Sequence, residues 1–206
     1  MALLLAVACH LRNRPAAAAT EVLTSSGHHA MAWENSRAIE IPKRTYISVP
    51  MSIIHAGGRP MFRNEKWLGA YQLKPLPVWD SARWFTAGIY WLLGKRNKKA
   101  NDAISREPGT MVCLSFHASK TLGDTQGGAI LHDNPEADKW LRRARFDGRT
   151  EGVPPAEDTF DMIGWHAYLS PDVAARLLFK LSVLPKHNDP LPNDDYPALD
   201  QMEIFK

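Results

Sequence analysis

The chain has 206 residues, and 25 Lys or Arg against 22 Asp or Glu give it a formal net charge of +3. Hydrophobic residues make up 45% and charged residues 23%, which excludes a disordered chain, a collagen-like repeat and a disulfide scaffold. The charge is too small to indicate binding to nucleic acid or to a lipid surface. The two cysteines, Cys9 and Cys113, fit a reducing compartment and lack metal-binding spacing, so no metal site is predicted.

The chain begins with an apolar run, MALLLAVAC. No basic residue precedes this run, and it is short for the core of a signal sequence. Its apolar residues fit one face of a short helix instead: Leu4, Leu5, Ala8 and Leu11. No other segment approaches the roughly 20 apolar residues that cross a bilayer. We therefore expect a cytoplasmic protein without membrane contact.

Short elements are predicted in the first half of the chain. The β-branched, aromatic and Gly patterns predict strands at residues 21–23, 43–49, 59–62 and 76–79. Helical sequence follows a turn at about residues 28–37, and a short helix at 52–56 is closed by Gly57 and Gly58. Residues 63–74 show no clear pattern. The strand at 76–79 ends at Asp80.

The second half has stronger signals. A basic, polar loop at residues 95–110 precedes a continuous apolar run at 111–116, which is typical of a strand buried on both faces of a sheet. A second strand is predicted at 127–132, and helical periodicity begins at Pro135. After a polar loop at 147–164, Ser170-Pro171-Asp172 predicts a helix start, because it combines a capping hydroxyl, proline and an early acid.

Alternating strands and helices indicate the α/β class. We predict a compact domain over residues 1–184, followed by a Pro-rich tail over residues 185–206.

The segment SFHASKTLGDTQGGA, residues 115–129, carries the clearest chemistry. Lys120 lies just past a buried strand, where burial could lower its pKa and make it a nucleophile. Ser115 could offer a hydroxyl to an anion, and Gly127 and Gly128 permit a close backbone approach. By spacing alone, a surface lysine in a strand-to-loop turn is the simpler interpretation.

This segment resembles the Schiff-base segment of the DegT/DnrJ/EryC1/StrS-type sugar aminotransferases, a fold-type I family that depends on pyridoxal 5′-phosphate (PLP). By this resemblance, Lys120 is the catalytic, PLP-binding lysine and Ser115 contacts the cofactor phosphate. The fold expected is a compact version of the family's large domain, with a mostly parallel sheet flanked by helices and with most of the C-terminal domain absent.

Two earlier segments resemble the same family. Residues 26–30, SGHHA, resemble its Ser-Gly-Thr-x-Ala turn, which makes Gly27 and His28 candidate phosphate ligands at a helix N-terminus. Residues 44–48 and 56–62 resemble the next strand-and-helix segment. The resemblance implies that Tyr46 stacks on the pyridine ring, whereas without it Tyr46 would be interpreted as a core aromatic of a strand.

Two later segments complete the resemblance. Residues 77–83, PVWDSAR, place Asp80 at the aspartate that pairs with the pyridine nitrogen, and Arg83 near the cofactor's phenolic oxygen. Residues 164–170, GWHAYLS, place His166 at a position that reaches the phosphate bound by the neighbouring subunit.

The resemblance implies a PLP-dependent aminotransferase. The amino donor would be an amino acid, with glutamate typical of the family, and the acceptor a nucleotide-linked keto sugar. It also implies a homodimer with shared sites. Two alternatives remain: a PLP-binding protein without transamination, and a cofactor-free dimeric protein of the same fold with a structural or regulatory role.

Overall fold

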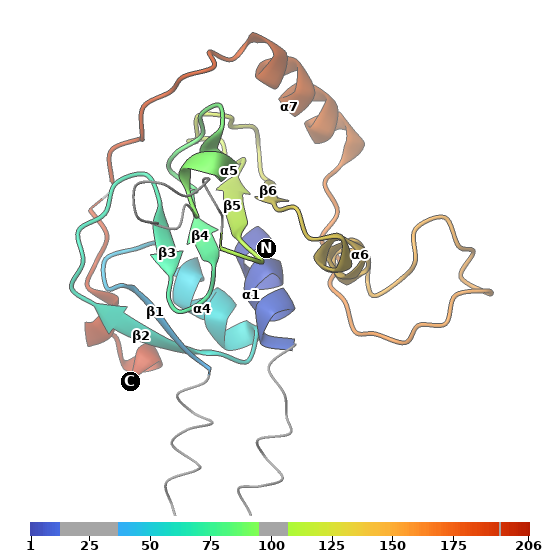
Figure 1. Ribbon diagram of the computed structural model, residues 1–206, viewed down its shortest axis with the longest axis horizontal. Helices are drawn as coiled ribbons and strands as arrows, with labels where there is room; N and C mark the ends of the chain where they lie inside the picture. The colour runs from blue at the N-terminus through green and yellow to red at the C-terminus, as the bar shows by residue number, and fades with distance from the viewer. Residues whose placement is uncertain (13–36, 95–106, 194) are drawn as a thin grey trace, which may run out of the picture.

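The computed structural model describes residues 1–12, 37–94, 107–193 and 195–206. The chain begins with helix α1 (Ala2–Arg12), as the sequence predicts, and this helix is more deeply buried than a one-faced helix would be. Seven of its residues are buried: Leu4, Leu5, Ala6, Val7, Ala8, Cys9 and Leu11. Figure 1 shows α1 near the middle of the molecule.

A small parallel unit follows, made of strand β1 (Ala38–Pro42), helix α4 (Ser48–His55) and strand β2 (Arg59–Arg63). The helix ends at a Gly pair: Gly57 has a φ of +78°, and a Cβ at Gly58 would lie 2.9 Å from a methyl carbon of Ile53. The predicted strand over 43–49 is wrong, because β1 stops at Pro42 and the helix begins at Ser48.

The second sheet has four strands in chain order: β3 (Tyr71–Leu73), β4 (Val78–Asp80), β5 (Met111–Ser115) and β6 (Gly128–Leu131). The pair β4–β5 is parallel, whereas β3–β4 and β5–β6 are antiparallel. The α/β class is confirmed, and this sheet is more mixed than the expected, mostly parallel one. The hairpin β3–β4 accounts for the difference, because only four residues separate its strands.

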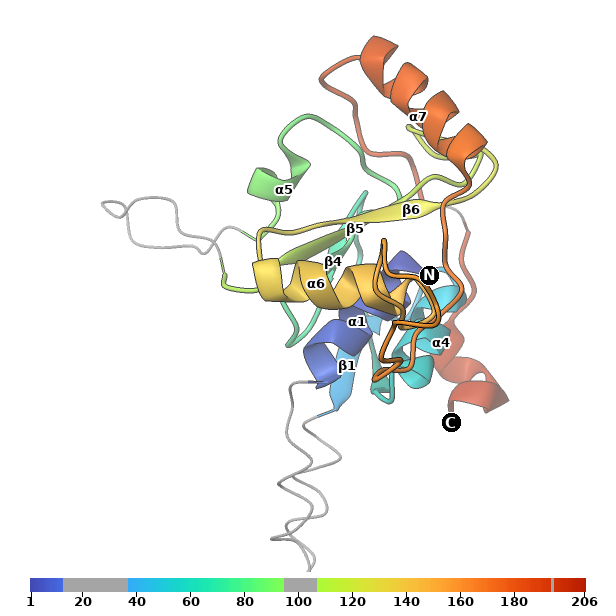
Figure 2. The same cartoon turned by 90° about the vertical axis from the view of Figure 1, so that its right-hand side faces the viewer.

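Strand alternation divides the core into two clusters, one on each face of this sheet. Val78, Met111 and Cys113 join α1 on one face, while Val112 and Leu114 point to the other. Figure 2 shows α1 and α6 (Pro135–Ala144) on the first face, and α5 (Ile89–Leu92) and α7 (Pro171–Val183) on the second.

The two later helices begin where the sequence predicts. The Asn134 side chain caps α6 by accepting hydrogen bonds from the N–H groups of Glu136 at 2.9 Å and Ala137 at 3.1 Å. Ser170 precedes Pro171 at the start of α7, but its hydroxyl bonds to the Asp172 side chain instead of capping the backbone.

The C-terminal segment runs back over the edge of the β3–β4 hairpin (Figure 1). The indole N–H of Trp84 donates to the Asn188 carbonyl at 2.9 Å, and the rings of Phe62 and Phe205 pack edge to face. Leu199 is fully buried at the start of a 3₁₀ turn, Leu199–Gln201. A membrane-spanning helix is not found among the residues that the structure describes.

Candidate active site

Asp80 ends β4 and is held by two hydrogen bonds. The backbone N–H of Ala82 donates to its Oδ1 at 3.0 Å, and the hydroxyl of Tyr71 donates to its Oδ2 at 2.9 Å. Tyr71 lies directly opposite Asp80 in the antiparallel β3–β4 pair. Because side chains alternate along a strand, Asp80 shares the α1 face of the sheet with Val78.

Tyr71 is itself anchored by a third element. Its hydroxyl lies 2.7 Å from the hydroxyl of Thr45, which follows β1. Both residues are buried, and the Tyr71 ring packs edge to face on Trp67, with the ring centroids 4.7 Å apart. The hydrogen-bonded group Thr45–Tyr71–Asp80 therefore joins three separate segments of the chain.

Burial dominates the electrostatics of this group. It raises the pKa of Asp80, although the Ala82 N–H, the Tyr71 hydroxyl and the charge of Lys120 all act in the opposite direction. The pKa of Tyr71 is raised well above its usual value, first by burial and then by the negative charge of Asp80. The neighbours of Asp80 thus offset only part of the cost of burying its charged form.

Lys120 reaches the same strand ends from the turn after β5. This turn is closed by hydrogen bonds from the Lys120 N–H to the His117 carbonyl and from the Asp124 N–H to the Phe116 carbonyl, both at 2.9 Å. Lys120, Ser115 and Ser81 line a small pocket of about 10 Å³, enough for about one water. The charge of Lys120 also acts on Asp80, which connects the two residues electrostatically.

The start of α1 lies at this edge of the sheet, which the sequence interpretation missed. Gly128 pairs with Ser115, and a Cβ at Gly128 would lie 3.3 Å from the Cβ of Ala2 and 2.6 Å from the Leu114 carbonyl oxygen. Only glycine permits this approach. The N-terminal end of the α1 helix dipole adds positive potential here.

Two other residues predicted to bind the cofactor, Tyr46 and Arg83, have surroundings that the sequence did not indicate. Tyr46 is on the loop before α4 and is 60% exposed, so it is not the core strand aromatic that the sequence also allowed. Arg83 is 8% exposed and its guanidinium donates to the Pro192 carbonyl and, at 3.4 Å, to the Tyr196 hydroxyl. The structure therefore places Arg83 under the C-terminal segment.

His166 lies on the loop that follows α6. Its Nδ1 is 3.1 Å from the Asp147 carboxylate, and its ring centroid is 4.1 Å from that of Tyr168. Neither contact involves Asp80 or Lys120. The predicted phosphate residues Gly27 and His28, with the elements expected over 21–36, lie outside the described residues.

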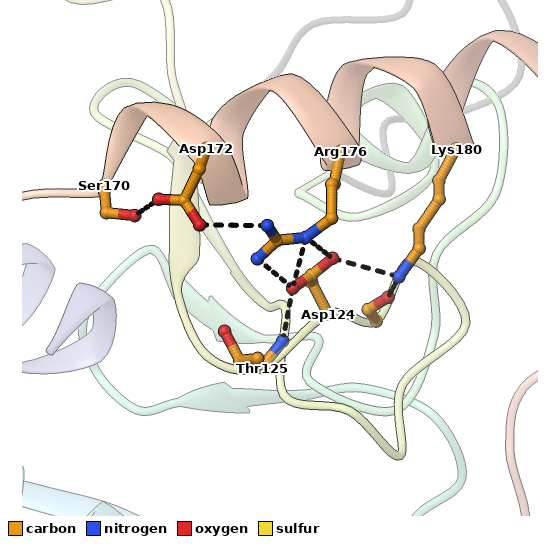
Figure 3. A network of polar contacts seen from close by, with 7 residues as sticks. Asp124, Thr125, Ser170, Asp172, Arg176 and Lys180 are labelled. Carbon is orange, nitrogen blue, oxygen red and sulfur yellow. Dashed lines mark hydrogen bonds and ion pairs between the residues drawn. The ribbon is translucent and has the colours of Figure 1, made fainter.

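A second polar cluster fixes the loop beyond Lys120 to α7 (Figure 3). Asp124 accepts hydrogen bonds from Arg176 at 3.0 Å, from Lys180 at 3.1 Å and from the Thr125 N–H at 2.7 Å. Lys180 also donates to the Gly123 carbonyl at 2.6 Å. Arg176 first, then the Thr125 N–H and Lys180, hold the pKa of Asp124 far below its usual value.

Known structures share this fold. A DegT DnrJ EryC1 StrS aminotransferase from Brucella abortus is 20% identical with a TM-score of 0.50, and the match covers 72% of this chain and 48% of that one. DesV from S. venezuelae, solved with a ketimine intermediate, is 18% identical with a TM-score of 0.52, and the match covers 89% and 51%. No protein-family model and no curated protein matches the sequence.

These likenesses identify the fold as that of PLP-dependent aminotransferases. The matched region spans about half the length of the two solved proteins.

Proposed function

We propose that this chain binds PLP and transfers an amino group from an amino acid, glutamate being the expected donor, to a keto acceptor. The observation that carries the proposal is the placement of Asp80 and Lys120 at the same end of the parallel strands β4 and β5, with the charge of Lys120 acting on Asp80. A partly compensated buried acid beside a lysine at the carboxyl ends of parallel strands is typical of a functional site in an α/β fold.

The residues present fit PLP chemically. Asp80 accepts one hydrogen bond on each oxygen, and a carboxylate has about four acceptor positions, so a protonated ring nitrogen can still bind. Ser115 and the positive start of α1 suit a phosphate, and Lys120 supplies a primary amine. The pocket that Lys120 and Ser115 line holds about one water, so binding of the ring requires the side chains around Lys120 to move apart.

When bound, PLP supplies a carbonyl that reacts with amines and a ring that withdraws electrons. The chain contributes three actions. Lys120 Nζ binds the cofactor covalently and, once displaced by the donor amine, moves a proton to and from the substrate carbon. Asp80 holds the proton on the ring nitrogen, and Ser115 orients the phosphate.

The finer assignments belong to the same proposal. They are a nucleotide-linked keto sugar as acceptor, a cytoplasmic homodimer with shared sites, and a domain over residues 1–184 with a tail over 185–206. In the dimer, Gly27 and His28 would bind the phosphate with Ser115, and Tyr46 would cover the ring. His166 is exposed, which suits a residue that reaches into a neighbouring subunit's site.

A second candidate is PLP binding without transamination. The position of Arg83 favours it, because its guanidinium donates hydrogen bonds to the C-terminal segment, at the Pro192 carbonyl and the Tyr196 hydroxyl. The third candidate, a cofactor-free structural or regulatory dimer, predicts that no PLP binds.

The test is an absorption spectrum of the protein with PLP, followed by borohydride reduction and mass mapping. We expect a visible band and a reduced adduct on Lys120, and a shift of the band when glutamate is added. Lys120→Ala should abolish the band, while the exposed Lys139→Ala should keep it. A band that does not respond to any amino donor would favour the second candidate. Absence of both band and adduct would contradict the proposal.

A further inference from the structure

We propose that Tyr71 is the positioning residue for Asp80: its hydroxyl, oriented by Thr45, holds the carboxylate ionised and aimed at the ring nitrogen of the cofactor. The inference rests on the proposed function and adds two residues to it. Thr45 lies within the segment 44–48 but was given no role there, and Tyr71 comes from a segment, residues 63–74, without a recognisable pattern.

The direction of the hydrogen bonds supports the assignment. An ionised carboxylate only accepts, so the Tyr71 hydroxyl must donate its one proton to Asp80 at 2.9 Å. The same oxygen then accepts from the Thr45 hydroxyl at 2.7 Å. The chain Thr45 → Tyr71 → Asp80 therefore has one consistent arrangement when Asp80 is charged, and this arrangement favours the charged form.

Few other groups near Asp80 could keep its carboxylate ionised and oriented. Ala82 contributes a backbone N–H to the other carboxylate oxygen, and Lys120 acts on Asp80 through its charge but is the amine required for binding the cofactor. Once Lys120 is committed to the cofactor, its charge no longer acts on Asp80 in the same way. Tyr71 is a neutral donor on a neighbouring strand, so its contribution persists.

Packing alone does not require the hydroxyl. The Tyr71 ring is buried against Trp67, and phenylalanine would keep that edge-to-face contact. The hydroxyl is the polar part of a side chain that is 3% exposed, and its two partners are Thr45 and Asp80. A buried hydroxyl with these two partners indicates a role in the polar group.

The experiment measures the Kd of PLP and of 1-deazapyridoxal phosphate, in which carbon replaces the ring nitrogen, for wild type and Tyr71→Phe. Losing a hydrogen bond to a charged group is expected to weaken PLP binding about tenfold. The deaza analogue has no nitrogen for Asp80 to hold, so its Kd should not change. Tyr90→Phe, on α5, is the matched control and should bind both ligands like wild type.

A second pair of variants covers the case in which Tyr71→Phe does not fold. Thr45→Val should weaken PLP binding by a smaller factor, and Thr45→Ser, which keeps the hydroxyl, should restore it. Equal weakening of both ligands in Tyr71→Phe, or no change in either, would overturn the inference while leaving the proposed function intact. A wild-type protein that binds no PLP would overturn both.

Discussion

Asp80, which is partly buried, and Asp124, which is buried, are two acids at the same end of one sheet, and their surroundings differ in kind. Asp124 has a guanidinium, an ammonium and a backbone N–H, and its pKa is lowered. Asp80 has a hydroxyl and a backbone N–H within hydrogen-bond distance, and its pKa is raised. Asp124 is fully compensated by its own chain, whereas Asp80 is not.

This difference supports the proposal of a structural role for Asp124 and a cofactor-binding role for Asp80. A buried carboxylate with two cationic partners contributes to holding α7 on the loop after Lys120. A buried carboxylate without a dedicated cation costs stability unless a ligand supplies the missing positive charge. The protonated ring of PLP is such a ligand.

The largest effect is expected for cofactor binding by Asp80→Asn. Replacing an ionic hydrogen bond to the ring nitrogen should weaken PLP binding about 10- to 100-fold. Asparagine fits the site without PLP, since its oxygen can accept from Ala82 and its amide can donate to Tyr71, which then donates to Thr45. A PLP titration measures the loss. Unchanged affinity would mean that Asp80 does not touch the cofactor.

Folding stability should change more when Asp124 is replaced than when Asp80 is replaced. Asp124→Asn removes the charge that Arg176 and Lys180 share, so α7 should detach more readily from the loop. We expect the melting temperature to fall by several degrees and amide exchange to accelerate in α7. Asp172→Asn is the control, because Asp172 pairs with the same Arg176 but is exposed on the helix surface. Equal losses in both variants would contradict a special role for Asp124.

Asp80 and Asp124 should also make opposite contributions to the pH dependence of folding stability. The raised pKa of Asp80 means that the folded state binds more protons above about pH 4, so stability falls as pH rises toward the folded pKa. In the apo form, Asp80→Asn should therefore gain stability over wild type as pH rises.

For Asp124, the unfolded state binds more protons below about pH 4, so its contribution is present above that pH and is lost as pH falls. The loss of unfolding free energy in Asp124→Asn, relative to wild type, should become smaller as pH falls. Urea unfolding from pH 4 to 8 measures both profiles, and parallel profiles would contradict the distinction.

The smallest effect concerns the thiol beside Asp80. Burial, and then the charge of Asp80, raise the pKa of Cys113, and burial likewise raises that of Cys9. Neither thiol should react with a disulfide reagent at pH 8 in the folded protein, and both should react in urea. Rapid labelling of Cys113 without denaturant would show that this end of the sheet is open to solvent.

The sequence predicted the elements that depend on local signals. The strands β5 and β6 came from an apolar run and a Gly pair, and the start of α6 came from helical periodicity at Pro135. The predicted site residues Asp80, Ser115 and Lys120 lie at adjoining strand ends.

Other features depend on partners that are remote along the chain. The role proposed for Tyr71 depends on its pairing with Asp80 across the hairpin and on Thr45, 26 residues earlier. Arg83 is directed toward Pro192, 109 residues later. Neither partner can be inferred from local spacing, which is why Tyr71 was missed and the contacts of Arg83 with the C-terminal segment were not predicted.

The central position of α1 has a consequence for synthesis of the protein. The helix ends at Arg12, and β5, against which it packs, begins about 100 residues later at Met111. At roughly 5–20 residues per second, α1 leaves the ribosome on the order of ten seconds before that partner exists. Helix α4 emerges earlier and covers one side of α1, but the side that packs on β5 and β6 stays exposed during this interval. A nascent chain should therefore bind chaperones at its first helix until these strands have emerged.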